Sequence, residues 1–265
     1  MGVLNVTPDS FSDGGRHFST DDALRAADQM LAAGAVFIDV GGESTRPGAA
    51  PVPADEELRR VLPVVRALVA RGALVSLDSS KPEVIRPCLE AGAQLVNDVR
   101  ALTLPGALEA VAASDAAVCL MHMQGDPGSM QRAPRYDDPV AEVGAFLAAR
   151  VAACTAAGIA RDRLLVDPGF GFGKTLSHNL ALLRGLPRVA SLAGGLPLLA
   201  GLSRKSMIGA LTGRPVGERL AGGLALAIAA LEGGARIIRT HDVAETVDAL
   251  KVWQAFRGAA PAEEA

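Results

Sequence analysis

Hydrogen-bond acceptors recur at positions from which they could together read a flat heterocycle. Asp78, Asn97 and Asp167 each follow a short apolar run of the chain. Lys205 lies in the polar string "SRK" after another such run. Carboxylate and amide oxygens accept hydrogen bonds from ring N–H and amino groups, and a lysine ammonium donates to a ring carbonyl or ring nitrogen. The set predicts a site for a heterocycle with several N–H donors, such as an aminopyrimidinone.

A second group of side chains is suited to phosphate. Arg239 and His241 follow the last apolar run, and Asn5 lies at the end of the first one. Arginine holds phosphate oxygens through paired N–H donors. An asparagine oxygen can bind a Mg²⁺ ion that keeps most of its waters and bridges phosphates. These residues predict a phosphate group at the other end of the same site.

The string "VDPGFGFGKT" from Val166 to Thr175 ends like a phosphate-binding loop. That motif needs a further glycine where this chain has Pro168, which offers no N–H to a phosphate. The three glycines alternate strictly, so they also fail the G-x-G-x-x-G pattern of dinucleotide sites. The sequence therefore disfavours a nucleotide-binding loop, and Lys174 is interpreted as incidental or as a support for the loop.

Two long connections are rich in Pro, Gly, Asp and Ser. They span residues 7–18 and 41–53, and the second carries Thr45 and Arg46. Ordinary surface loops are one interpretation. Loops of this length in a compact domain are more often lids or binding loops, and we expect that role here.

Repeated elements must bring these side chains together. A short apolar run, a polar residue and a helical segment recur about every thirty residues. The apolar runs, predicted as strands, are residues 1–6, 36–40, 73–77, 94–96, 116–121, 164–166, 196–200 and 236–238. The predicted helices are 20–33, 54–71, 81–91, 105–113, 138–157, 176–190, 215–233 and 242–257, with a short extra helix near Ser206.

Strands without polar alternation are buried on both faces, which indicates a parallel sheet covered by helices. Eight such repeats close most naturally as a (β/α)₈ TIM barrel, with a doubly wound open sheet as the alternative. We expect one barrel domain over residues 1–257 and a disordered tail over 258–265. Barrels of this kind usually carry chain before the first strand, whereas here the first strand begins at Met1. Their active sites lie at the carboxyl ends of the strands, where the polar residues above occur.

Composition narrows the class of ligand. The net charge is −3 and the chain has one Trp and one Tyr, so neither nucleic acid nor an anionic membrane surface is an expected partner. No apolar run approaches the ~20 residues of a membrane span, and no signal peptide opens the chain. Cys88, Cys119 and Cys154 are interpreted as buried small side chains of a reduced, cytoplasmic protein that acts on small molecules.

Seven strings occur in order along the chain: "GVLNVTPDSFSDGG", "IDVGGESTRPGA", "LVNDV", "LMHMQG", "DPGFGFGK", "GLSRKSMIG" and "RTHDV". Together they resemble the motifs of the dihydropteroate synthase family from Met1 to about Val243. The resemblance implies a (β/α)₈ barrel, a homodimer and Mg²⁺. It also implies a transferase of folate biosynthesis that condenses hydroxymethyl-dihydropterin pyrophosphate with para-aminobenzoate, and a site of the sulfonamide-sensitive type.

The resemblance also implies roles for individual residues. The pterin would contact Asp78, Asn97, Val99, Met121, Asp167, Phe172, Lys205 and Arg239. The pyrophosphate would contact Asn5, Arg239 and His241, with Asn5 as the direct ligand of Mg²⁺. The aminobenzoate would contact Thr45, Arg46, Pro47, Phe172, Ser203 and Lys205. Asp78, Lys205, Arg239 and His241 would be catalytic, and Asp9 and Asp39 would support them.

The order of bond changes follows from the reactants. The aniline nitrogen of aminobenzoate is a weak nucleophile, and no strong base is evident beside its expected position. We therefore expect pyrophosphate to leave first and a cationic pterin to be held by Asp78 and Asp167. A pterin-binding methyltransferase domain and a non-catalytic pterin-binding paralogue are the alternatives. The pair Ser79-Ser80 departs from the family, which often has threonine and a bulky residue there.

Overall fold

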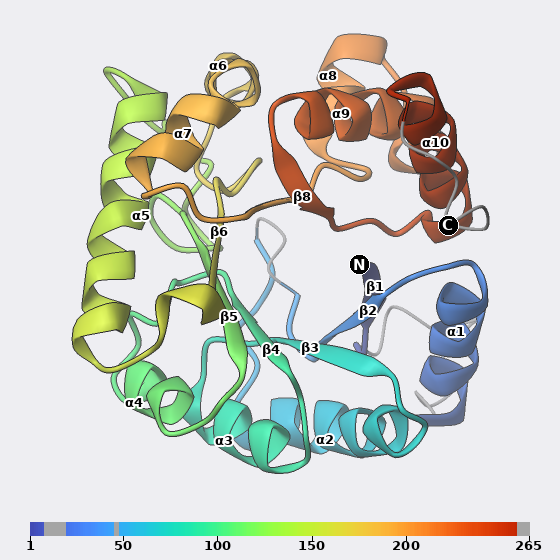
Figure 1. Ribbon diagram of the computed structural model, residues 1–265, viewed down its shortest axis with the longest axis vertical. Helices are drawn as coiled ribbons and strands as arrows, with labels where there is room; N and C mark the ends of the chain where they lie inside the picture. The colour runs from blue at the N-terminus through green and yellow to red at the C-terminus, as the bar shows by residue number, and fades with distance from the viewer. Residues whose placement is uncertain (8–19, 45–47, 259–265) are drawn as a thin grey trace.

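The computed structural model describes residues 1–7, 20–44 and 48–258, and it contains one closed parallel barrel (Figure 1). The strands are β1 (Gly2–Asn5), β2 (Phe37–Gly41), β3 (Leu74–Asp78), β4 (Leu95–Asp98), β5 (Ala117–Met121), β6 (Leu164–Asp167), β7 (Leu198–Ala200) and β8 (Ala235–Ile238). Each pairs in parallel with the next one along the chain.

The last strand closes onto the first just beyond the end of β8. Thr240 forms a parallel bridge with Gly2, and the Val3 N–H donates to the Thr240 carbonyl at 3.0 Å. The Thr240 N–H in turn donates to the Met1 carbonyl at 3.0 Å. A sheet of eight parallel strands closed in this way is a TIM barrel, so the predicted fold class is confirmed over the open-sheet alternative.

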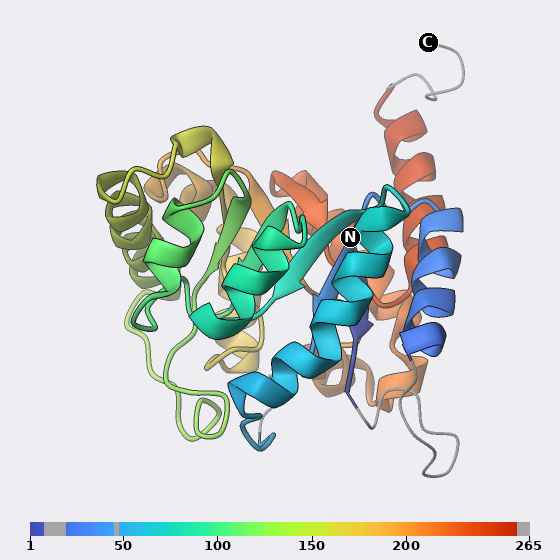
Figure 2. The same cartoon turned by 90° about the horizontal axis from the view of Figure 1, so that it is seen from below.

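Helices cover the outside of the barrel, as Figure 1 shows. They are α1 (Thr20–Ala32), α2 (Ala54–Ala70), α3 (Pro82–Glu90), α4 (Ala107–Ala112), α5 (Pro139–Ala156), α6 (Leu176–Arg184), α7 (Leu186–Leu192), α8 (Ser206–Thr212), α9 (Leu220–Glu232) and α10 (Val243–Phe256). The first and last helices, α1 and α10, lie side by side in both views, so the outer ring also closes (Figures 1 and 2).

Two predicted helices differ from the observed ones. The segment 176–190 is two helices separated at Gly185, because Pro187 lacks the N–H that a continuous helix would use. A Cβ at Gly185 would lie 2.6 Å from Val140 Cγ2, so α5 packs closely against this break. The segment 215–233 begins with the short 3₁₀ turn Val216–Glu218, and α9 starts only after it.

Helix α5 has 18 residues and is long and apolar enough to cross a membrane by length and composition alone. The sequence analysis did not identify residues 139–156 as an apolar run of this length. In this fold it belongs to the outer ring, and its side chains Val143, Leu147 and Cys154 are fully buried. No other helix in the described ranges meets both criteria.

The barrel interior is apolar along the strands and polar at their carboxyl ends. A small cluster of Leu95, Cys119, Leu165 and Leu199 fills the lower interior. Because side chains alternate along a strand, Leu95 and Asn97 share the inward face of β4. The strand register places Asn5, Gly41, Asp78 and Asn97 beside one another across β1 to β4. The register therefore gathers polar side chains at one end of the barrel.

Candidate active site

A pocket opens at the carboxyl ends of the strands and contains ≈ 340 Å³ of empty space, part of it open to solvent. Its lining is Asp78, Asn97, Val99, Met121, Asp167, Phe170, Phe172, Gly201, Lys205 and Arg239. The structure thus brings together all eight residues expected around a pterin. Phe170 and Gly201 complete the wall, and the sequence analysis did not name them. Acidic and basic groups face an apolar wall here, as is usual in small-molecule sites.

The register of the sheet sets the acceptor side of the pocket. Asp78 ends β3 and pairs with Gly41 on one side and with Asn97 on the other. A Cβ at Gly41 would lie 3.3 Å from the Asp78 Cβ, so the glycine leaves space for this carboxylate. Burial of the Asp78 carboxylate raises its pKa to about 7, and the charge of Asp39 adds to the rise.

Arg239 joins the pocket carboxylate of Asp78 to the buried carboxylate of Asp39. Its Nε donates to Asp39 Oδ2 at 2.6 Å, and its NH2 donates to Asp78 Oδ2 at 2.8 Å. Asp39 is fully buried and also accepts from Ser76 Oγ at 2.5 Å and from Asn97 Nδ2 at 3.1 Å. The last bond turns the amide oxygen of Asn97 away from Asp39. One guanidinium thus serves two carboxylates, and its charge lowers the pKa of Asp78 by less than burial raises it.

Lys205 and Asp167 form the opposite wall. The Lys205 Nζ lies 4.3 Å from the centroid of the Phe172 ring, a cation–π contact. Burial lowers the pKa of Lys205 to about 8, although Asp167 opposes the shift. Burial also raises the pKa of Asp167, whose Oδ1 accepts the Gly169 N–H at 2.7 Å. A cation, an anion and an aromatic ring therefore meet in one small space.

The glycines after β6 are required by close backbone contacts. Gly169, Gly171 and Gly173 have φ of 70°, 80° and 64°, in the left-handed region that favours glycine. A Cβ at Gly169 would lie 1.9 Å from the His122 carbonyl oxygen. One at Gly173 would lie 2.3 Å from the Gln124 carbonyl oxygen. The turn can thus press against the chain that follows β5.

Lys174 supports this turn and is not incidental. Its side chain is buried, and its Nζ donates to the carbonyl oxygens of Gly169 at 2.9 Å, Phe172 at 3.0 Å and His122 at 3.3 Å. The Nζ also lies 3.0 Å from His122 Nδ1. No nucleotide-loop geometry accompanies these contacts, because the lysine points into the protein.

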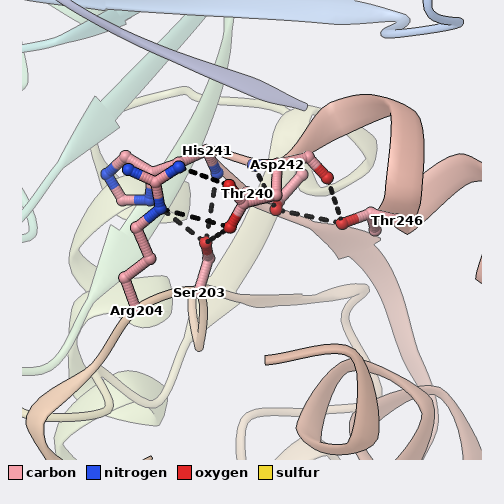
Figure 3. Close-up of polar contacts among 6 residues, drawn as sticks. All are labelled: Ser203, Arg204, Thr240, His241, Asp242 and Thr246. Atoms are coloured by element: carbon pink, nitrogen blue, oxygen red, sulfur yellow. Dashed lines mark hydrogen bonds and ion pairs between the residues drawn. The ribbon is translucent and has the colours of Figure 1, made fainter. Parts of the chain in front are cut away.

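Of the three expected phosphate residues, Arg239 lines the pocket, whereas Asn5 and His241 lie outside its lining. Asn5 ends β1, and His241 follows β8, which closes onto β1. Figure 3 shows His241 against Ser203: its backbone N–H donates to Ser203 Oγ at 3.2 Å, and its Nδ1 lies 3.2 Å from the same oxygen. Asp242 binds Arg204, with a distance of 3.2 Å between Nε and Oδ2, and so ties the two loops together (Figure 3).

Other expected residues have different surroundings. Thr45, Arg46, Pro47 and Asp9 lie outside the described residues. Asp98 lies at the end of β4 and His122 directly follows β5, but both bind loop residues and do not line the pocket. Asp98 accepts the N–H groups of Arg100 at 2.8 Å and Leu102 at 2.7 Å, and burial lowers the pKa of His122 to about 3.

Sequence reasoning missed one further support. Arg219 NH1 donates to the carbonyl oxygens of Arg204 at 3.1 Å and Lys205 at 3.4 Å. Arg204 itself has φ of 58°, an unusual conformation for a residue with a side chain. Arg219 therefore helps to hold the turn that presents Lys205. Its only sequence signal is an arginine just before an apolar helix, which many proteins share.

Known proteins match this chain over almost all of its length. A family model described as pterin binding enzyme matches residues 1–241. The dihydropteroate synthase of Escherichia coli (strain K12) is 57% identical over 256 residues, which cover 96% of this chain and 90% of that protein. The dihydropteroate synthase of Haemophilus influenzae is 51% identical over 260 residues, covering 98% and 94%.

Solved structures agree. Yersinia pestis dihydropteroate synthase with a sulfonamide drug complex has a TM-score of 0.92 and 53% identity, covering 97% of this chain and 93% of that one. The Xanthomonas albilineans enzyme with 4-aminobenzoic acid has a TM-score of 0.92 and 53% identity, covering 98% and 93%. The Burkholderia cenocepacia enzyme complexed with 7,8-dihydropteroate has a TM-score of 0.89 and 50% identity, covering 97% and 91%. The chain described here therefore belongs to the pterin-binding enzymes and, among them, to the dihydropteroate synthase family.

Proposed function

We propose that this protein condenses hydroxymethyl-dihydropterin pyrophosphate with para-aminobenzoate to form dihydropteroate and pyrophosphate, a step of folate biosynthesis. The observation that carries the proposal is the convergence of eight expected pterin residues on one pocket of a barrel. The relatives supply independent support, because those with 43–57% identity carry the name of this transferase.

The pocket polarity matches the hydrogen-bonding edges of a pterin. Asp78, Asn97 and Asp167 would accept from the ring N–H and amino groups, and Lys205 would donate to the ring carbonyl or nitrogen. Phe172, with the Lys205 ammonium 4.3 Å from its ring centroid, would form the wall that both substrates share. The acceptors are buried, so a ligand that lacks the matching donors would leave them unpaired and bind weakly.

Charge placement favours departure of pyrophosphate before attack by the amine. The buried carboxylates of Asp78 and Asp167 would stabilise positive charge on the pterin after the C–O bond to pyrophosphate breaks. Arg239, together with Asn5 and His241 near the rim, would hold the leaving pyrophosphate. The amine nitrogen would then bond to the methylene carbon and lose its proton to solvent or to the departing pyrophosphate. We propose these residue roles for this chain.

The proposed Mg²⁺ fits the donor set near β1. Among the described residues no three His, Cys, Asp or Glu side chains form a metal-binding group. Asn5 offers a hard oxygen ligand at the rim, which suits an ion that retains waters and binds mainly through the phosphates of the substrate. When bound, Mg²⁺ would neutralise charge that develops on the leaving pyrophosphate. Asn5 would orient the diphosphate through that ion.

The aminobenzoate would lie between Phe172, Lys205 and Ser203, with Thr45, Arg46 and Pro47 supplied by the loop after β2. Ser203 is held against His241 and Asp242, so its loop has a defined place beside the pocket. The relative solved with 4-aminobenzoic acid supports the proposal that this chain binds aminobenzoate.

We further propose a cytoplasmic homodimer. Helix α9 is almost wholly apolar, yet of its residues only Ala227 and Ala230 are buried. Neighbouring Val252 and Phe256 on α10 are 72% and 85% exposed, and α8, α9 and α10 gather on one side of the barrel (Figure 1). Such a patch suits a second copy of the chain. The three free cysteines are buried, as in a reduced compartment.

One experiment separates this function from its alternatives. Mixing the protein with both substrates and Mg²⁺ should release pyrophosphate and form dihydropteroate in equal amounts, and Asp78→Ala should abolish both. A methyltransferase domain would bind the pterin without releasing pyrophosphate. A non-catalytic paralogue would bind the substrates and leave them unchanged. Absence of pyrophosphate release from the unmodified protein would refute the proposal.

A further inference from the structure

The turn that follows β6 is folded around the buried amino group of Lys174, whose pKa burial lowers to about 7 although the charge of Asp167 opposes the shift. Lys174 is 3% exposed, and its Nζ lies within 3.3 Å of three carbonyl oxygens and one imidazole nitrogen. Two of those carbonyls, from Gly169 and Phe172, belong to the turn itself. Peptide carbonyls arranged around a cation resemble an ion site, and here the chain fills the site with its own side chain.

His122 completes the shell from the other side. Burial and the nearby Lys174 charge lower the pKa of His122 to about 3, so its ring is neutral and its Nδ1 can accept from the ammonium. The His122 carbonyl accepts from the same ammonium at 3.3 Å. Lys174 therefore joins the turn after β6 to the chain leaving β5.

Two other carbonyls of the turn have their own donors. The Tyr136 hydroxyl donates to the Gly173 carbonyl at 3.0 Å, and the Gln131 side-chain amide donates to the Gly171 carbonyl. These donors come from outside the turn and are neutral. The Lys174 amino group reaches two turn carbonyls at once, and in its protonated form it bonds more strongly than a neutral donor.

The two ends of this turn carry pocket residues. Asp167 precedes Gly169 and binds its N–H at 2.7 Å, and Phe172 lies two residues before Lys174. Both line the pocket, while the Lys174 side chain points away from it and is absent from the lining. A change in the place of the Gly169 or Phe172 carbonyl would therefore move an acceptor and an aromatic wall of the site.

We propose that Lys174 is a positioning residue for both substrates: its ammonium fixes the Gly169 and Phe172 carbonyls and thereby sets the places of Asp167 and the Phe172 ring. The proposal rests on the function assigned above. Binding at the phosphate end should respond less, because Asn5 ends β1, Arg239 follows β8, and neither strand pairs with β6. Loss of the Lys174 amino group should therefore weaken binding of the pterin and of the aminobenzoate more than binding of pyrophosphate.

Lys174→Met tests this, since it keeps most of the aliphatic length and removes every donor. Binding of pterin and of inorganic pyrophosphate is measured separately by calorimetry on the full chain, and KM and kcat are measured for both substrates. We expect the Kd for pterin and the KM for aminobenzoate to rise about tenfold or more, while the Kd for pyrophosphate stays within about twofold. Lys251→Met, an identical change at an exposed position on α10, should match the unmodified protein throughout.

The pyrophosphate measurement distinguishes positioning from a general loss of folded protein. Unfolding lowers the fraction of binding-competent molecules and therefore weakens the apparent affinity for every ligand by the same factor. Unaltered Kd for pterin and KM for aminobenzoate in folded Lys174→Met, or an equal loss for all three ligands, would overturn the proposal. Should Lys174→Met not fold, Lys174→Leu, which also removes every donor, decides by the same criteria. An unmodified protein that binds no pterin would instead overturn the proposed function.

Discussion

Arg239 is held by Asp78 at one end of its guanidinium, with 2.8 Å between NH2 and Oδ2, while its Nε binds Asp39 at 2.6 Å. Asp78 is also a pocket residue that the pterin would need as an acceptor. The ion pair with Arg239 and the hydrogen bonds to the pterin would thus share the carboxylate of Asp78. Its protonation should therefore affect both the stability of the free protein and its affinity for the heterocycle.

Asp78→Asn should abolish turnover and stabilise the free protein at alkaline pH. The pKa of Asp78 is about 7 in the folded state against an ordinary value of 3.8. Protonated Asp78 therefore contributes its full share to the free energy of unfolding below about pH 4, and this contribution is lost as the pH rises through 7. The amide carries no charge to desolvate. Denaturant titration should show a gain of about 1–2 kcal/mol at pH 8 and none at pH 4. A loss of stability at pH 8 would show that the Arg239 pair outweighs desolvation.

Pterin affinity should fall in acid. Ionised Asp78 accepts hydrogen bonds with both oxygens, whereas the protonated form has lost part of that capacity. Binding of pterin to the ionised form should make the Kd rise about tenfold per pH unit below pH 7 and level off above about pH 8. Calorimetry between pH 5.5 and 8.5 measures it, with pyrophosphate as the comparison ligand. A Kd that does not change over this range would remove Asp78 from the pterin contacts.

Gly169→Ala should disrupt the turn more than a comparable glycine elsewhere. Its Cβ would lie 1.9 Å from the His122 carbonyl oxygen, and its φ is 70°. Gly158 has a φ of 90° but no atom within 4 Å of an added Cβ. Thermal or denaturant unfolding should show a loss of about 3 kcal/mol or more for Gly169→Ala and about 1 kcal/mol for Gly158→Ala. Equal losses would mean that only the backbone conformation matters, and not the contact.

The exposed face of α9 and α10 gives a prediction about assembly. Leu220→Glu places a charge on the apolar helix α9, where the side chain is 37% exposed. Light scattering coupled to gel filtration should report a dimer for the unmodified protein and a larger monomer fraction for the variant. Leu192→Glu is the control, because Leu192 is 41% exposed on α7, which lies beside α5 and away from α10 (Figure 1). A monomeric unmodified protein at micromolar concentration would contradict the proposed homodimer.

Much of the fold and of the pocket could be predicted because of the way parallel barrels are built. Polar residues after apolar runs, such as Asp78 and Asn97, must meet at one end once the strands align. The role of Lys174 could not be predicted, since its partners become neighbours only when the turn folds back on the chain after β5. The break at Gly185 depends on a contact with α5 that local propensity does not contain. The loop with Thr45 and its neighbours stays a prediction.

Asp39→Asn should shift the pH dependence of pterin binding without touching the ligand. The amide can keep the contacts of Asp39: one oxygen for Arg239 Nε and Asn97 Nδ2, and an N–H group facing Ser76 Oγ. The negative charge of Asp39 helps to raise the pKa of Asp78, so its removal should lower that pKa. The substitution also leaves Asp78 as the one carboxylate paired with Arg239, which should lower the pKa of Asp78 further. The midpoint of the pterin Kd profile should therefore move towards acid by about 1 pH unit, with little change in Kd at pH 8.5. The contradicting result is a midpoint that stays near pH 7 in a variant that folds normally. It would show that burial alone sets the pKa of Asp78 and that Asp39 and Asp78 do not share the charge of Arg239.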